Sequence, residues 1–145
     1  MDNTICDFAT PFYEQGGEET YPHQNEGFFL ALEPFAGVVE SVTEIENFYD
    51  VWFLTKPSYH NIHCYTEKAQ WIRKYFGYEF LKRLIMCCDK SLIKGFKGDF
   101  LVDDYNKDGQ PEFGGHWIHY RNDKYPWKDW RDWLKPENDN RFNIV

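Results

Sequence analysis

The chain has 145 residues, a formal net charge of −8 and an isoelectric point near 5.0. A general nucleic-acid binder needs a basic surface, so this balance argues against a nucleic acid polymer as partner. The length suits one domain with a real core, and 42% hydrophobic and 20% aromatic residues exclude a disordered protein. An anionic small molecule stays compatible, provided that a few cations or backbone N–H groups are focused locally.

The cysteines and the lack of long apolar runs indicate the compartment. Cys6, Cys64, Cys87 and Cys88 form no CxxC pair, so we interpret them as reduced thiols. No signal peptide or membrane-length apolar run is visible. We expect a cytoplasmic protein without a membrane partner, and a homodimer is left open.

Helical and strand patterns alternate along the chain. Residues 9–27 are polar and broken by proline and glycine, which predicts a loop or a small irregular insertion. Apolar periodicity and short buried runs then predict, in order, a helix from 38 to 48, a strand 51–55, a helix 66–76, a short helix near 79–82, strands at 83–88, 100–102 and 117–120, and a last helix near 127–134.

This alternation predicts an α/β layer sandwich with a mostly parallel sheet, built as one domain over residues 1–145. In such sheets, ligands collect at the carboxyl ends of the strands. Thr55, Asp103 and Asp104 stand at predicted strand ends of this kind. The sequence therefore places its candidate chemistry at one edge of the sheet.

The acidic pair Asp103-Asp104 is a candidate metal site. Two adjacent carboxylates repel each other and a divalent ion relieves that repulsion, but Asp is also common in a solvated turn after a strand. These residues alone give the two interpretations equal weight. Asp2, Thr55 and Lys90 are each weak when taken singly, because a turn, an ordinary strand residue and a solvated lysine explain them equally well.

Two further patterns imitate metal sites. The run from Asp104 to Gly109 begins like a calcium loop, but its twelfth position is Gly115, so we expect a polar hairpin or Asx-turn loop instead. The pair His116 and His119 lies in a predicted strand, where residues three apart face opposite sides. His60 and His63 lie in a loop without an arranged acid or thiol, so both pairs favour ordinary histidines.

Several short motifs, weak one by one, form a specific series in this order. They are Met1-Asp2-Asn3-Thr4-Ile5-Cys6-Asp7-Phe8, Gly27-Phe28-Phe29 leading to Pro34, Gly37 and Glu40, Leu54-Thr55 with Pro57, Glu67-Lys68 with Trp71, Lys74 and Phe76-Gly77, Asp89-Lys90, Gly98 to Asp104, and Phe113 with Gly115, Ile118-His119, Tyr125-Pro126 and Trp130. The series resembles the haloacid dehalogenase-like phosphatases, and most closely the 5′(3′)-deoxyribonucleotidase family. The resemblance spans nearly the whole chain and implies a three-layer Rossmann-like fold with a reduced cap insertion at about residues 9–27.

The resemblance implies Mg²⁺-dependent hydrolysis of a nucleoside monophosphate through an aspartyl phosphate. Its catalytic candidates are Asp2, which would protonate the leaving ribose oxygen and then activate water, with Thr55 and Lys90 at the phosphate. Its metal ligands are Asp2, Asp103 and Asp104. Its substrate-binding candidates are Phe8, which would contact the base, and Lys68, Lys56 and Ser58. Charge neutralisation by the metal and the lysines is what lets a carboxylate approach an anionic phosphate.

The same resemblance places the attacking aspartate directly before Met1, on a strand that the sequence does not include. We therefore expect the natural polypeptide to begin upstream. Two alternatives stay open. One is a catalytically inactive nucleotide-binding or interaction relic of the fold, and the other is a phosphatase for another small phosphomonoester.

Overall fold

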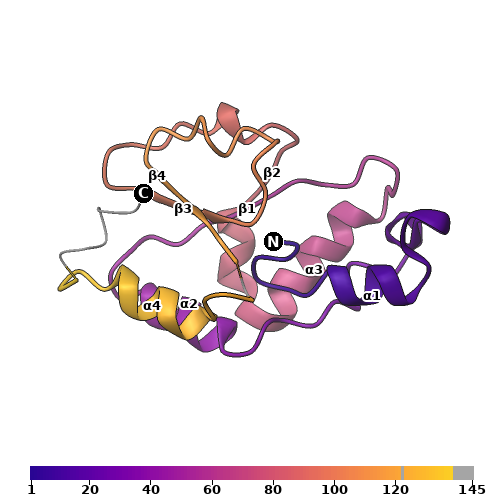
Figure 1. The fold of residues 1–145 in the computed structure, drawn as a ribbon, viewed down its shortest axis with the longest axis horizontal. Coiled ribbons are helices and arrows are strands. Elements are labelled where there is room, and N and C mark those ends of the chain that lie inside the picture. The colour runs from indigo at the N-terminus through magenta and orange to yellow at the C-terminus, as the bar shows by residue number, and fades with distance from the viewer. Residues whose placement is uncertain (122, 139–145) are drawn as a thin grey trace. The chain divides into compact units, whose positions relative to one another are not determined.

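The computed structural model describes residues 1–121 and 123–138 (Figure 1). The chain divides into two compact units. The first unit contains residues 1–34 and 52–88, and the second contains residues 35–51 and those from 89 onward. The elements of the first unit are α1 (Ala9–Glu14), η1 (Gly17–Glu19), η2 (Pro22–Gln24), β1 (Phe53–Thr55), α3 (Cys64–Phe76), η3 (Tyr78–Arg83) and β2 (Leu84–Met86). Those of the second are α2 (Val38–Ile45), η4 (Lys90–Leu92), β3 (Phe100–Asp103), β4 (His116–His119) and α4 (Trp127–Leu134).

In the first unit, β1 and β2 pair in parallel, with Thr55 opposite Met86. Helix α3 connects them and supplies the core, because its apolar side faces inward. Trp71 on this helix is fully buried, and its indole N–H donates to the Leu32 carbonyl at 2.7 Å. Helix α3 ends at Gly77, whose φ of 94° is a backbone conformation that residues other than glycine rarely adopt. Through the hydrogen bond from Trp71 to Leu32, α3 also holds the segment that precedes α2.

In the second unit, β3 and β4 also pair in parallel, with Asp103 opposite His119. Helices α2 and α4 pack together, and their contact is partly polar. Glu44 on α2 forms ion pairs with Arg131 and Lys135, both at 3.1 Å, and the Tyr49 hydroxyl donates to the Leu134 carbonyl at 2.8 Å. These contacts fasten the two helices of this unit to each other.

The sequence predicted most elements within a few residues. The mixed α/β character and the parallel pairing of strands are confirmed. Strands β1 and β2 are shorter than predicted, β3 is one residue longer, and β4 has the predicted length but begins one residue earlier. Helix α3 begins at Cys64 rather than 66, and the insertion at 9–27 contains helix α1 where an irregular segment was predicted. Within residues 1–121 and 123–138, the strands form two separate two-stranded sheets. The three-layer fold built around one mostly parallel sheet therefore stays a prediction.

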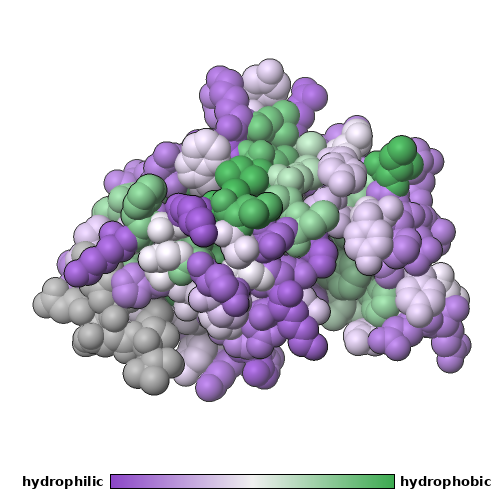
Figure 2. All heavy atoms as spheres, turned by 90° about the horizontal axis from the view of Figure 1, so that it is seen from above, coloured by the Kyte–Doolittle hydropathy of each residue, from purple (hydrophilic) through white to green (hydrophobic). Residues whose placement is uncertain are grey.

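The face shown in Figure 2 is mostly hydrophilic, with a group of hydrophobic side chains among the polar ones. The most exposed large apolar residues include Ile62, Leu92 and Phe96. Among the helices of the described residues, none is long and apolar enough to cross a bilayer. All four cysteines lie in the described part and are free thiols, as predicted.

Candidate functional site

A tight N-terminal turn positions Asp2. The Met1 carbonyl accepts hydrogen bonds from the backbone N–H groups of Thr4 at 3.1 Å and Ile5 at 2.8 Å. Asn3 adopts a φ of 51°, which asparagine tolerates better than most residues, and its side-chain oxygen accepts from the N–H groups of Phe8 and Ala9. The turn, which carries Asp2, is thus fixed to the start of α1.

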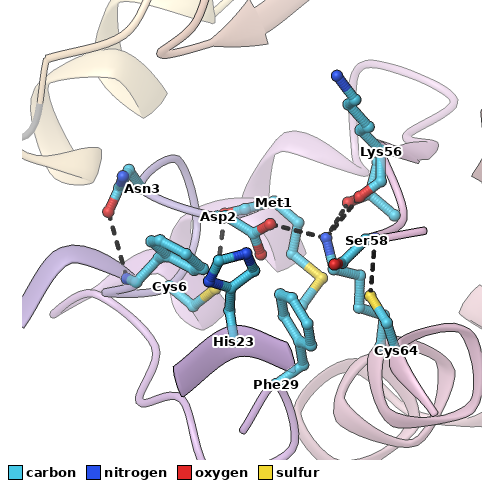
Figure 3. A network of polar contacts seen from close by, with 12 residues as sticks. Met1, Asp2, Asn3, Cys6, His23, Phe29, Lys56, Ser58 and Cys64 are labelled. Atoms are coloured by element: carbon cyan, nitrogen blue, oxygen red, sulfur yellow. Dashed lines mark hydrogen bonds and ion pairs between the residues drawn. The ribbon is translucent and has the colours of Figure 1, made fainter. Parts of the chain in front are cut away.

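The ammonium group of Lys68 is the centre of this first cluster (Figure 3). Lys68 is on α3 and is 0% exposed. Its Nζ donates to Asp2 Oδ2 at 2.7 Å, to the Thr55 hydroxyl at 3.1 Å and to the Lys56 carbonyl at 2.7 Å. Because an ammonium has three protons, these three acceptors satisfy it completely. The structure therefore brings the predicted residues Asp2, Thr55 and Lys68 together.

The Asp2 carboxylate is satisfied on one side only. While Oδ2 pairs with Lys68, Oδ1 is buried and has no hydrogen-bond partner within the described residues. A buried polar atom without a partner is unfavourable and calls for an explanation, such as a catalytic role or a water, ion or ligand that binds there. Asp2 thus has one oxygen anchored and one oxygen available to a ligand or a proton.

Three other residues of this unit were predicted to bind substrate, namely Phe8, Lys56 and Ser58, and each makes a different kind of contact. Phe8 belongs to an aromatic group, with its ring centroid 5.3 Å from that of Phe12 and 5.4 Å from that of Phe28. Lys56 contributes its carbonyl, whereas its side chain points away from Asp2 (Figure 3). The Ser58 backbone N–H donates to Cys64 Sγ at 3.2 Å, which joins the loop after β1 to the start of α3.

The thiols near this cluster are not nucleophiles. Burial raises the pKa of Cys6 far above its ordinary value, and the nearby Asp2 carboxylate adds to this effect. Burial also raises the pKa of Cys64, although Lys68 opposes it. Both thiols are therefore protonated at neutral pH, and a thiolate is what a cysteine nucleophile requires.

Glu67 is a buried residue of this region to which the sequence assigned no role. Its Oε1 accepts from the Gly27 N–H at 2.6 Å, and its Oε2 accepts from the Phe29 N–H at 3.0 Å. The carboxylate thus fastens the end of the insertion to α3, one residue before Lys68. The only available sequence signal was the Glu67-Lys68 motif, because an acid in the first turn of a helix usually faces solvent.

A second cluster, in the other unit, surrounds Asp103. Asp103 is 2% exposed and lies at the end of β3, where its Oδ2 accepts from the buried ammonium of Lys90. Its Oδ1 accepts from the side-chain amide of Gln110 at 2.9 Å and from the Tyr105 N–H at 3.1 Å. Burial acts to raise the pKa of Asp103, whereas positive charge, that of Lys90 included, and the hydrogen bonds from Lys90 and the Tyr105 N–H lower it, so the pKa lies below its ordinary value. The carboxylate is therefore ionised, as a cation ligand must be.

The loop after β3 holds this cluster in place. Gln110 is fully buried and bridges the loop, because its Oε1 also accepts from the Asp108 N–H at 2.9 Å. The Asp108 carbonyl in turn accepts from the Lys90 N–H at 2.7 Å. Gly109 has a φ of 86°, and a side chain there would collide with the backbone of Ser91. The predicted hairpin is wrong, because β3 and β4 run parallel, and the Asx-type hydrogen bond is made by Asp103 to the Tyr105 N–H. The sequence did not single out Gln110.

The acidic neighbour and the histidines complete this second region. The Asp104 carbonyl lies 2.9 Å from Nε2 of His119, while His116 stacks on Phe100. The two histidines occur in strand β4 as predicted. Across residues 1–121 and 123–138, no three side chains of the His, Cys, Asp and Glu types gather as a preformed metal centre.

Known proteins resemble this chain over most of its length. The model of the family "5′ nucleotidase, deoxy (Pyrimidine), cytosolic type C protein" matches residues 7–125. A putative 5′(3′)-deoxyribonucleotidase of Vibrio phage KVP40 is 30% identical over 135 residues, which cover 90% of this chain and 76% of the phage protein. The cytosolic 5′(3′)-deoxyribonucleotidase of Homo sapiens is 33% identical over 99 residues, covering 67% of this chain and 48% of the human protein. A putative 5′(3′)-deoxyribonucleotidase of Bordetella bronchiseptica is 32% identical over 120 residues, covering 74% and 60% respectively.

These matches agree with the motif series on which the resemblance was based. The matched region includes Thr55, Lys68, Lys90, Asp103 and Asp104. The chain therefore belongs to the cytosolic type C deoxy 5′-nucleotidase family, whose members are hydrolases of phosphoric monoesters.

Proposed function

We propose that the protein is a Mg²⁺-dependent phosphatase that hydrolyses deoxynucleoside monophosphates to nucleoside and phosphate. The observation that carries the proposal is the half-satisfied Asp2 carboxylate, with Oδ2 held by Lys68 and Oδ1 buried without a partner in the described residues. A general acid needs a fixed orientation and an oxygen that can reach the leaving group. The anchored Oδ2 and the unpaired Oδ1 of Asp2 support this role.

In this proposal, the residues of the first unit act on the phosphate and on the leaving oxygen. Asp2 gives a proton to the ribose oxygen as the phosphorus–oxygen bond breaks, and it later accepts a proton from the attacking water. Lys68 and the Thr55 hydroxyl, both buried beside it, supply positive charge and a hydrogen-bond donor for the phosphoryl oxygens. Lys68 would therefore exchange one of its present acceptors for a phosphate oxygen. Phosphate binding is thus expected to change the hydrogen bonds of the same ammonium group that holds the catalytic Asp2.

The residues of the second unit suit a hard cation. Mg²⁺ prefers oxygen ligands, and Asp103 and Asp104 provide two carboxylates at the end of β3. The low pKa of Asp103 and the rigid support from Gln110 keep one of them charged and oriented. Bound Mg²⁺ would neutralise phosphate charge, and Lys90 would add a second cation.

The nucleophile completes the proposal. If the reaction proceeds through an aspartyl phosphate, the attacking aspartate belongs directly before Met1. The assay therefore compares residues 1–145 with a chain extended upstream of Met1 so that an aspartate occupies that position. Release of phosphate from dUMP and dTMP is measured with Mg²⁺ and with excess chelator.

The assay distinguishes the proposal from its alternatives. Turnover of dUMP and dTMP by the extended chain, lost on chelation, supports the nucleotidase. Turnover of a sugar phosphate or p-nitrophenyl phosphate in preference to both nucleotides would replace it with another phosphomonoesterase. Binding of dUMP without turnover of any phosphomonoester would identify an inactive nucleotide-binding protein. Asp2→Asn in the extended chain should lower kcat by about 10²–10⁴ while leaving Mg²⁺ dependence in place.

A further inference from the structure

The insertion carries a half-buried histidine that none of the motifs assigned. His23 lies in η2, and its Nδ1 is buried without a hydrogen-bond partner among the described residues. Its ring contacts aromatic residues, with centroids 5.5 Å from that of Phe12 and 6.0 Å from that of Phe8. The ring therefore lies among aromatic side chains, while its Nδ1 lacks a hydrogen-bond partner in the described residues.

The position of His23 is fixed by its backbone. Asn61, which is 1% exposed, donates from its side-chain amide to the carbonyls of His23 at 3.2 Å and Asn25 at 3.0 Å. Tyr21, two residues before His23, has a φ of 48°, a conformation that is unfavourable for an aromatic residue, and the buried Pro22 follows it. The loop after β1 thus holds the insertion so that His23 is turned inward.

His23 lies near Asp2, and each side chain has a buried polar atom without a hydrogen-bond partner in the described residues. The two side chains are electrostatically coupled, and Figure 3 shows the His23 ring pointing from the insertion toward the Asp2 carboxylate. Asp2 Oδ1 is the other buried polar atom of this unit without a partner in the described residues. A ligand hydroxyl suits this pair, because it can donate one hydrogen bond to a carboxylate and accept another from an imidazole N–H.

The charge state of the imidazole fits the same role. Burial lowers the pKa of His23, and the nearby His60 adds to this, while Asp2 acts in the opposite direction. At neutral pH the ring is therefore predominantly uncharged, so it can form a neutral hydrogen bond without contributing a cation to phosphate binding. This separates His23 from the lysines, which serve the phosphate.

We propose that His23 binds the sugar of the nucleotide, with its Nδ1 hydrogen-bonded to the free 3′-hydroxyl of a deoxynucleoside 5′-monophosphate beside Asp2. This inference rests on the proposed nucleotidase function and specifies how the insertion recognises the substrate. A phosphate ester without a sugar would not use His23. The residue is therefore specific for the nucleoside part of the substrate.

The test measures binding to residues 1–145 by calorimetry in Mg²⁺, with three probes: dUMP, its 2′,3′-dideoxy analogue and inorganic phosphate. His23→Ala should weaken dUMP binding about tenfold, the size of one hydrogen bond, and leave the dideoxy analogue and phosphate unchanged. His23→Asn should retain most of the dUMP affinity, since its side-chain amide can occupy the place of Nδ1. His63→Ala, a change in an exposed histidine that pairs with Glu26, is the matched control and should leave all three affinities unchanged.

Two results would overturn the inference. Equal affinity of wild type and His23→Ala for dUMP would show that the imidazole does not bind the sugar. An equal loss for all three probes, accompanied by a lower thermal midpoint, would show a structural role only. Absence of binding of both dUMP and phosphate to the wild-type protein would instead contradict the proposed function itself.

Discussion

The Lys68 ammonium lies 2.7 Å from one carboxylate oxygen of Asp2, and the other oxygen of the same carboxylate is buried without a partner in the described residues. Lys68 is fully buried, whereas the Asp2 side chain is partly exposed. A buried charge depends on its partner for stability more than an accessible one does. The two partners of this ion pair thus differ in burial, and the effect of that difference on stability can be measured.

Asp2→Ala should destabilise the protein by about 1–3 kcal/mol, because Lys68 keeps its charge and retains only two neutral acceptors. The double variant Asp2→Ala with Lys68→Met removes that charge and should be more stable than Asp2→Ala alone. Urea unfolding of the four members of this cycle gives the coupling energy. Strict additivity of the two single effects would contradict the ion pair.

The pair of Lys90 and Asp103 predicts a dependence of stability on pH. Because the folded pKa of Asp103 is lowered, its ionised form stabilises the fold above the unfolded pKa of about 3.9, and this contribution disappears as the pH falls through the folded pKa. Asp103→Asn lacks the titrating group. The difference in unfolding free energy between wild type and this variant should be constant from about pH 5 to 7 and should shrink below about pH 4.

Urea titrations at several pH values between about 2.5 and 7 check this. A difference between wild type and Asp103→Asn that stays constant down to the lowest pH would show that the carboxyl is not stabilised in its ionised form. Asp123→Asn is a suitable control, because that carboxylate is exposed and pairs with its near neighbour Arg121. Its effect on stability should be small at every pH.

Gln110→Glu should disrupt the second cluster. The substitution replaces the amide that donates to Asp103 with a second carboxylate, so two negative charges would meet in a buried position. We expect a loss of about 2–4 kcal/mol in unfolding free energy and weaker Mg²⁺ binding. Asn106→Asp adds the same charge to an exposed position of the same loop and should change stability by less than about 0.5 kcal/mol. Equal effects of the two substitutions would exclude a special role for Gln110.

Glu67→Gln tests the anchoring of the insertion. One side-chain oxygen that accepts from Gly27 or Phe29 becomes an NH₂ group, which cannot accept, so one buried backbone N–H loses its partner. The expected cost is about 1–3 kcal/mol, with faster amide exchange at Gly27 and Phe29. Glu79→Gln, at an exposed glutamate, is the control. Unchanged exchange at both amides would mean that Glu67 does not hold the insertion.

The sequence predicted the elements well because their signals are local. Apolar periodicity identified α2, and short buried runs identified β1 and β3, where Phe53 and Leu101 are indeed buried. The boundary of α3 was less accurate, since the helix begins at Cys64 through a backbone hydrogen bond from Glu67 to His63. Such a start carries no side-chain signature that a sequence reveals.

The site was only partly predictable for a different reason. Asp2, Thr55, Lys68, Lys90 and Asp103 stood out through motifs, and the structure groups them as two clusters. Glu67 and Gln110 did not, because their roles depend on backbone groups and loops that fold against them from elsewhere in the chain. Polar residues that support others leave little trace in spacing or composition.

The central claim is Mg²⁺-dependent hydrolysis of a deoxynucleoside monophosphate. Its most direct test is phosphate release from dUMP by a chain that carries an aspartate directly before Met1, measured with Mg²⁺, with chelator, and with Asp103→Asn. The account predicts turnover that requires Mg²⁺ and falls at least about 10²-fold in the variant. Absence of Mg²⁺-dependent turnover of dUMP and of every other phosphomonoester, by a correctly folded protein, would contradict it.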